Sequence, residues 1–238
     1  MTGARQIFLG SRRGPALPYD SRVEYLDIGV GGGGFVSEIR IDDNDFVLSC
    51  DMMVLGAPTA SWARYFGTYT SESAASTRVI AYNSTTNLYV GYRRAFNSQT
   101  QWSSGSCIYS RFILELKYLS IRFLDPTSGA RIAGGVLSAP SGSADTGRVA
   151  LGSSTARFRC WGFHIAHSGV AVLDWIPVRV GTGGAMYDRI TGALIQSSMP
   201  PTPGPDKTVN LNGGGCKCLN CFSSRSSARS TRLWKEAA

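Results

Sequence analysis

The chain has 238 residues, of which 43% are hydrophobic and 17% are charged, and this composition excludes general disorder. Its length is sufficient for one large β domain with a core or for two small domains, and its 28 glycines favour a fold with many tight turns. The formal net charge of +8 is carried mainly by the two ends, because residues 19–198 hold 15 basic and 14 acidic residues, which argues against a folded nucleic-acid reader.

Residues 1–18 are predicted to form a lead-in without regular structure, since Gly14, Pro15 and Pro18 interrupt any element. They lack the apolar segment of a secretory signal, so export by a standard signal peptide is not expected. No run of about 18 apolar residues occurs in the chain, so membrane insertion is not expected either.

From Tyr19 to Ser198 the sequence predicts strand after strand, separated by turns rich in glycine, serine, threonine and asparagine. The most apolar strand is expected at residues 46–55, where Gly56 and Pro58 end it. The other expected strands are 23–30, 64–69, 77–82, 87–93, 149–152, 158–166 and 172–178. About ten short strands without a convincing helix predict an all-β fold, a two-sheet antiparallel jelly-roll sandwich.

Residues 108–123 change the phase of their alternation between apolar and polar side chains. Apolar residues occupy even positions up to Tyr118 and odd positions from Leu119 onward. This slip of one residue predicts a bulge or a tight connection between two strands. Residues 125–129, with the sequence Asp-Pro-Thr-Ser-Gly, predict a turn directly afterwards.

Residues 172–196 predict a strand, a glycine-rich turn and a second strand. Leu173 and Trp175 share one face of the first strand, because side chains alternate along a strand. Residues 186–194 then predict a short strand, a turn closed by Gly192 and another strand. Nothing in this stretch has a catalytic signature.

Residues 199–205 contain four prolines, which cannot continue the interior of a sheet and predict an extended exit from it. We therefore divide the chain into a lead-in at 1–18, a domain at 19–198 and a flexible basic tail at 199–238, rich in proline, glycine, serine and arginine.

The six cysteines form two groups. Three lie singly in apolar, strand-like sequence and are predicted to be buried free thiols, namely Cys50, Cys107 and Cys160. Three cluster in the tail, namely Cys216, Cys218 and Cys221. Such thiolates could contribute to a zinc or iron–sulfur site, but the nearest histidine, His167, belongs to the preceding domain. A flexible tail is the preferred interpretation.

Two segments together resemble a recurrent family. They are 23–30, with the sequence VEYLDIGV, and 173–194, with the sequences LDWIPVR and AMYDRITGAL. They are similar to the "VEY…YIDTGI" and "RDFIPVR…GYLYDRVSGKLF" signatures of concanavalin A-like, LamG-type jelly-roll domains of bacterial surface proteins and gut phages. The resemblance brackets residues 19–198. The family's spacer between the first two elements is missing here, since they are fused at Tyr25 and Leu26, and we expect this to remove a turn at the first strand.

Glycoside hydrolysis requires two carboxylates on one face, and the glucanases among these jelly rolls carry a Glu-x-Asp-x-x-Glu pattern. This chain has no such pattern, and its five glutamates are isolated: Glu24, Glu38, Glu72, Glu115 and Glu236. The sequence therefore predicts that the protein is not an enzyme.

No cofactor is predicted, and calcium is the one metal considered within the domain at 19–198. Three acids between residues 42 and 45 could supply oxygen ligands to it, namely Asp42, Asp43 and Asp45. The loop lacks EF-hand spacing, and an acidic turn before the strand at Phe46 is the preferred interpretation. His164 and His167 are three positions apart, so they are not expected to converge on one metal.

A carbohydrate site is the strongest binding hypothesis, because sugars bind to aromatic platforms flanked by amides. Residues 93–102 read as an exposed loop of this composition, and loops often carry function. The candidate ligand-binding residues are Tyr92, Arg94, Asn97, Gln99 and Trp102. Trp102 is the residue that a core position explains least well.

The sequence thus predicts a non-catalytic, lectin-like recognition module that binds carbohydrate or another cell-surface ligand. The resemblance implies a virion or a bacterial cell surface as its location. The alternative is a virion or tail-fibre structural protein that uses the jelly roll for contacts with other subunits. Neither hypothesis includes nucleic acid as a partner.

Overall fold

The computed structural model of the chain describes residues 17–29, 34–41, 43–56, 63–69, 79–82, 88–92, 95–97, 108–136, 148–153 and 157–207. All described residues belong to one compact unit, which ends at Lys207. They form seventeen strands and no helix, so no described helix could cross a membrane. The prediction of an all-β fold is confirmed.

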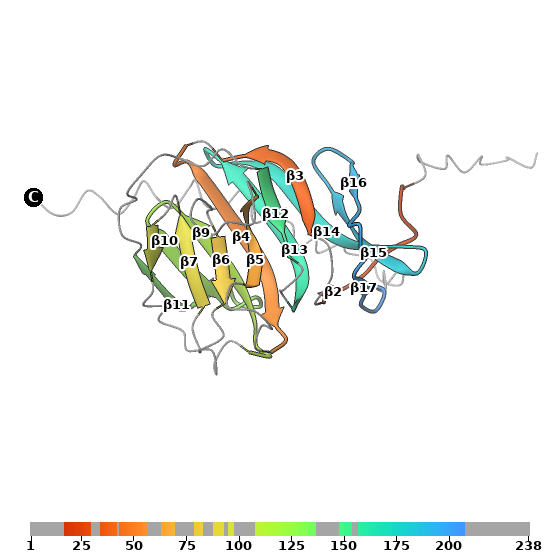
Figure 1. The fold of residues 1–238 in the computed structure, drawn as a ribbon, viewed down its shortest axis with the longest axis horizontal. Coiled ribbons are helices and arrows are strands. Elements are labelled where there is room, and N and C mark those ends of the chain that lie inside the picture. Colours follow the sequence, from red (N-terminus) through yellow and green to blue (C-terminus); the bar gives the residue numbers. More distant parts are fainter. Residues whose placement is uncertain are drawn as a thin grey trace, which may run out of the picture. The chain divides into compact units, whose positions relative to one another are not determined.

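The strands form two antiparallel sheets, which lie one over the other in Figure 1. The larger sheet has the order β11 (Arg131–Val136), β10 (Ser120–Leu124), β9 (Arg111–Lys117), β4 (Phe46–Val54), β13 (Phe158–His167), β14 (Val170–Val180), β15 (Gly183–Asp188) and β16 (Leu194–Ile195). Three short strands add to it: β1 (Ser21–Arg22), β2 (Leu26–Ile28) and β17 (Thr202–Pro203). The smaller sheet has the order β3 (Phe35–Arg40), β12 (Arg148–Leu151), β5 (Ala63–Tyr69), β6 (Val79–Tyr82), β7 (Leu88–Tyr92) and β8 (Ala95–Asn97).

Aromatic rings from the two sheets meet between them and form the centre of the core. Phe66 of β5 packs against Phe163 of β13, with ring centroids 5.3 Å apart. Phe35 of β3 packs edge-on against Trp175 of β14 at 6.3 Å. Such contacts bury large apolar areas from both layers, which is the main stabilising contribution of a sandwich. The expected two-sheet sandwich is therefore present.

Strand β4 shows how the sequence pattern produces this packing. Its side chains alternate strictly between buried and half-buried from Phe46 to Val54. Cys50 in β4 and Cys160 in β13 are buried free thiols, as predicted, with their Sγ atoms 3.9 Å apart. Burial raises the pKa of Cys50 and keeps it a thiol. Cys107 lies outside the described residues.

The phase change near residue 118 is a tight connection rather than a bulge. Strands β9 and β10 pair directly, with Lys117 opposite Ser120. The two residues between them, Tyr118 and Leu119, form the turn, and Leu119 has a φ of 56°. A two-residue hairpin turn needs this left-handed conformation. Across such a turn, the apolar residues change from even to odd positions while they stay on the same face of the sheet.

The prediction of one continuous strand at 23–30 is wrong. The chain forms β1, bends at Glu24 and then forms β2. The physical reason is a change of partner, because β1 pairs with β14 whereas β2 pairs with β13. We expected the missing spacer at Tyr25 and Leu26 to remove a turn. The chain instead has a bend at Glu24, directly before these two residues.

Residues 199–207 belong to this compact unit, whereas the sequence suggested that the tail begins at 199. Strand β17 pairs with β2, and the Gly184 amide donates a hydrogen bond of 2.8 Å to the Pro201 carbonyl. Prolines lack an amide donor, but their carbonyls still accept, so a proline-rich segment can occupy an edge of a sheet.

Candidate binding site

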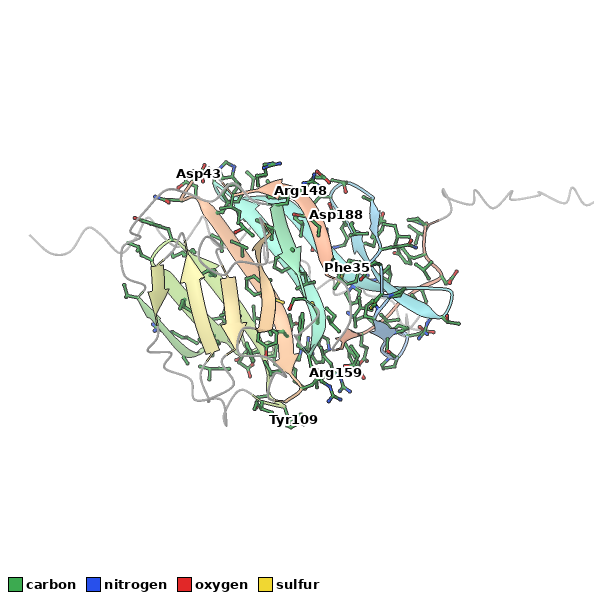
Figure 2. All side chains as sticks on the ribbon, viewed as in Figure 1. Phe35, Asp43, Tyr109, Arg148, Arg159 and Asp188 are labelled. Atoms are coloured by element: carbon green, nitrogen blue, oxygen red, sulfur yellow. The ribbon has the colours of Figure 1, made fainter. Side chains whose placement is uncertain are left out.

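A pocket of about 670 Å³ lies where β2 and β4 end, β13 begins and the segment 199–202 passes. Figure 2 shows Arg159 and Tyr109 at this end of the sandwich, and Asp43 and Arg148 at the other. The residues of interest that line the pocket are Asp27, Tyr109, Arg157, Arg159, Met199 and Thr202.

Three polar side chains form a row across neighbouring strands in this pocket. Asp27 of β2 lies opposite Arg159 of β13 on one side and opposite Thr202 of β17 on the other. Leu26 and Ile28 point into the core, so Asp27 between them faces outward, and its cross-strand partners share that face. The row therefore presents a guanidinium, a carboxylate and a hydroxyl side by side.

The row begins with an ion pair. The Nε of Arg159 donates a hydrogen bond of 2.9 Å to Oδ1 of Asp27, and both side chains are about one-third exposed. This hydrogen bond raises the pKa of Arg159 above its ordinary value. The guanidinium therefore remains charged and keeps its other N–H groups as donors.

A stack of two aromatic rings between two guanidinium groups fixes the position of Arg159. Its guanidinium lies 4.6 Å from the centroid of Tyr25, whose ring packs against Trp161 at 5.1 Å. Arg111 covers Trp161 at 4.4 Å and forms two hydrogen bonds to Asp51. Trp161 lies at a register shift between β13 and β4, and such bulges re-aim a side chain. The rings of this stack have aromatic or cationic neighbours, so we assign the stack a positioning role.

Three other lining residues are exposed. The side chain of Arg157 forms no hydrogen bond or ion pair within the part of the chain that the structure describes. Tyr109 is 68% exposed and Met199 is 58% exposed, and both are among the large hydrophobic residues that the fold leaves in solvent. Tyr109 also has a φ of 60°, an unfavourable conformation for a bulky side chain. Strain of this kind collects at binding sites.

The described carboxylates of the acidic loop before β4 have partners within the fold. Oδ2 of Asp43 lies 2.8 Å from Nε2 of His167, whose ring stacks on Phe46 at 4.2 Å. Oδ1 of Asp43 accepts a hydrogen bond from the amide of Asp45. Asp42 lies outside the described residues, and the described ones contain no group of three potential ligands. Calcium binding by this loop stays a prediction.

The two histidines do not converge. His167 contacts Asp43, whereas Nδ1 of His164 lies 3.9 Å from Oδ1 of Asp174 on β14. Each imidazole therefore has its own carboxylate, as the spacing along the strand implied.

The structure describes only part of the predicted sugar-binding segment. Tyr92 belongs to β7 and Asn97 to β8, where the structure describes the backbone alone. Arg94, Gln99 and Trp102 fall outside the described residues, as do the tail cysteines Cys216, Cys218 and Cys221. Sequence reasoning missed the pocket beside β2. The sequence signal for this pocket was a charged residue between two buried ones in each of two strands, Asp27 in β2 and Arg159 in β13. Only the pairing of β13 with β2 brings these two residues together.

The closing signature of the chain has a structural role in β14 to β16. Asp188 is 5% exposed and accepts hydrogen bonds from the amides of Asp174 and Ile190 and from Oγ1 of Thr191. Gly192 adopts a φ of 75°, which closes the turn. These hydrogen bonds explain the Asp-Arg-Ile-Thr-Gly sequence without a ligand.

Comparison with protein-family models, with curated proteins and with solved structures gives no match to this chain. The resemblance to concanavalin A-like domains therefore stays a prediction, and the sandwich architecture is the part of it that the structure shows.

Proposed function

We propose that the chain is a non-catalytic recognition module that binds carbohydrate in the pocket beside β2. The observation that carries this proposal is the placement of exposed Tyr109 and Met199 in the same pocket as the row Arg159, Asp27 and Thr202. A sugar ring has apolar C–H faces and a rim of hydroxyls. A site for it therefore needs apolar surface beside a few fixed polar groups.

The row can both donate hydrogen bonds to sugar hydroxyls and accept hydrogen bonds from them. Arg159 donates, Asp27 accepts, and the hydroxyl of Thr202 does both. Because the stack on Tyr25 and the ion pair hold Arg159 in place, little side-chain entropy is lost when a ligand binds. The tyrosine ring at the rim supplies the apolar face.

The carboxylates favour binding over hydrolysis. Among the described residues Asp27 is the one carboxylate that lines the pocket, and Arg159 holds it. Elsewhere in the described ranges most carboxylates have a hydrogen bond or ion pair: Asp20, Glu38, Asp43, Asp45, Asp51, Glu115, Asp125, Asp174, Asp188 and Asp206. A glycosidase needs two carboxyl groups within about 10 Å across its substrate.

The directions in which carboxyl pKa values are shifted also favour binding over hydrolysis. Hydrogen bonds from Ser128 lower the pKa of Asp125. Those from Ser21 and Arg179 lower the pKa of Asp206. A general acid at neutral pH needs a shift in the opposite direction.

A glycan array probed with the full chain tests the proposal. Tyr109→Ala should weaken binding about ten-fold, the loss expected when an aromatic contact is removed. Val170→Ala is the matched control, because Val170 is equally exposed on β14 but does not line the pocket. Circular dichroism establishes that both variants are folded.

Two outcomes would contradict the proposal: binding to no glycan on the array, or equal affinity of Tyr109→Ala and the wild-type chain. Release of reducing ends from a bound polysaccharide would instead indicate an enzyme.

A further inference from the structure

The charges in the pocket do not balance. Among its described lining residues, the pocket has two guanidinium groups, Arg157 and Arg159, and a single carboxylate, Asp27. Asp27 is already paired with Arg159 at 2.9 Å. Arg157 is therefore the charge that the described residues leave unmatched.

Arg157 is also held at its place in the pocket by the backbone. Its carbonyl accepts a hydrogen bond from the amide of Leu55, and Phe158 directly after it begins β13 with a buried ring. Leu55 lines the same pocket. The backbone at Arg157 is thus anchored between the ends of two strands while its side chain is exposed.

A planar guanidinium without a partner matches one kind of ligand group. Its N–H donors form a fork that binds a carboxylate or sulfate through two parallel hydrogen bonds. A neutral sugar offers hydroxyls, which the row of Arg159, Asp27 and Thr202 can already serve. The extra cation can form an ion pair only when the sugar carries a negative charge.

We infer that the ligand of this pocket is an acidic glycan whose carboxylate or sulfate binds Arg157, while Arg159, Asp27 and Thr202 bind its hydroxyls and Tyr109 covers its ring. This inference rests on the proposed function and names the class of sugar within it.

The test compares acidic and neutral forms of the same sugars. Oligogalacturonate and sialyllactose are each paired with their methyl esters, on an array and then by calorimetry with the full chain. Arg157→Gln should weaken binding of the acidic form about ten-fold or more and leave the neutral form unchanged. Arg131→Gln, at an exposed arginine on the edge strand β11, is the matched control and should change neither.

Salt provides a second readout. Raising the ionic strength from about 0.05 M to about 0.5 M should weaken binding of the acidic form and leave the neutral form nearly unaffected, because screening acts on charge pairs. Arg157→Gln should remove this salt dependence.

The outcomes separate the inference from the proposed function. If neutral sugars bind as tightly as acidic ones and lose affinity with Tyr109→Ala but not with Arg157→Gln, the inference is wrong and the proposed function stands. If a polyglutamate peptide binds as tightly as the acidic sugars and responds equally to Arg157→Gln, the site recognises charge alone and the inference is overturned. If no sugar of either form binds, the proposed function fails as well.

Discussion

The turns of β14 to β16 and the pocket beside β2 use similar polar residues in opposite ways. At the turn that closes β15, the carboxylate of Asp188 is buried and accepts three hydrogen bonds from its own chain. In the pocket, Arg157 has no partner among the described residues, and Tyr109 is exposed in a strained conformation. Polar groups that are satisfied internally stabilise a fold, whereas groups left unsatisfied at a concave surface are available to a ligand.

This contrast teaches that the most recognisable motif in a sequence need not be a functional site. The Asp-Arg-Ile-Thr-Gly motif attracts attention because a hairpin turn with a buried carboxylate needs those residue types at fixed spacing. The pocket has no local motif, since its residues come from five separate parts of the chain.

The largest expected effect is the loss of stability in Asp188→Ala. Removing the buried carboxylate leaves the amides of Asp174 and Ile190 and the hydroxyl of Thr191 without their acceptor. We expect the free energy of unfolding to fall by about 3 kcal/mol, measured by urea denaturation. Asp188→Asn keeps one acceptor oxygen and should lose less. Sugar affinity of folded Asp188→Ala should equal that of the wild type, and a large loss would mean that the two regions are coupled.

A smaller effect is expected at Tyr109, where strain and binding can be separated. Glycine tolerates the φ of 60° that alanine does not, so Tyr109→Gly should be more stable than Tyr109→Ala by about 1 kcal/mol. Both variants lose the ring and should lose affinity equally. Thermal or urea denaturation gives the first comparison and calorimetry the second. If alanine were the more stable residue here, as it is at ordinary positions, Tyr109 would not be strained.

The smallest effect concerns Asp174 and acid. Burial raises the pKa of this carboxyl, but the imidazole of His164 at 3.9 Å and the guanidinium of Arg189 outweigh it, so the net shift is downward. A lowered folded-state pKa means that the ionised group contributes stability above about pH 4 and that this contribution is lost as the pH falls through the lowered value.

Asp174→Asn should therefore be less stable than the wild type at pH 7, and the difference should shrink as the pH falls below about 4. Urea denaturation at a series of pH values measures it. A difference that is constant down to pH 3 would contradict the assignment.

Much of the fold followed from the sequence because it depends on local alternation. Strand β4 appears from Phe46 to Val54 within one residue of its predicted end, since five buried positions alternate with four outward ones. The turn at Gly192 and the connection at Leu119 also follow from local residue choice. The interruption at Glu24 does not, because it reflects a change of partner strand that nearby residues do not encode.

The candidate site was less predictable for the same reason. Aromatic and amide residues at 92–102 gave a compositional signal, whereas the pocket depends on which strands lie side by side. Arg159 and Asp27 are far apart in the chain and have no feature in common until β13 pairs with β2. The proline-rich segment reads as an exit, yet its carbonyls accept hydrogen bonds at the sheet edge, and it supplies Met199 and Thr202 to the pocket.

By itself, then, the sequence determined the all-β class, the main strands and the tight turns, because side-chain alternation and left-handed turn residues act over a few neighbouring positions. Only the tertiary structure decided which strands pair, that residues 199–207 complete the sheet edge and that Arg157, Arg159, Asp27 and Tyr109 line one pocket. Those outcomes depend on contacts between residues distant in the chain, and the balance of burial over the whole core selects among them.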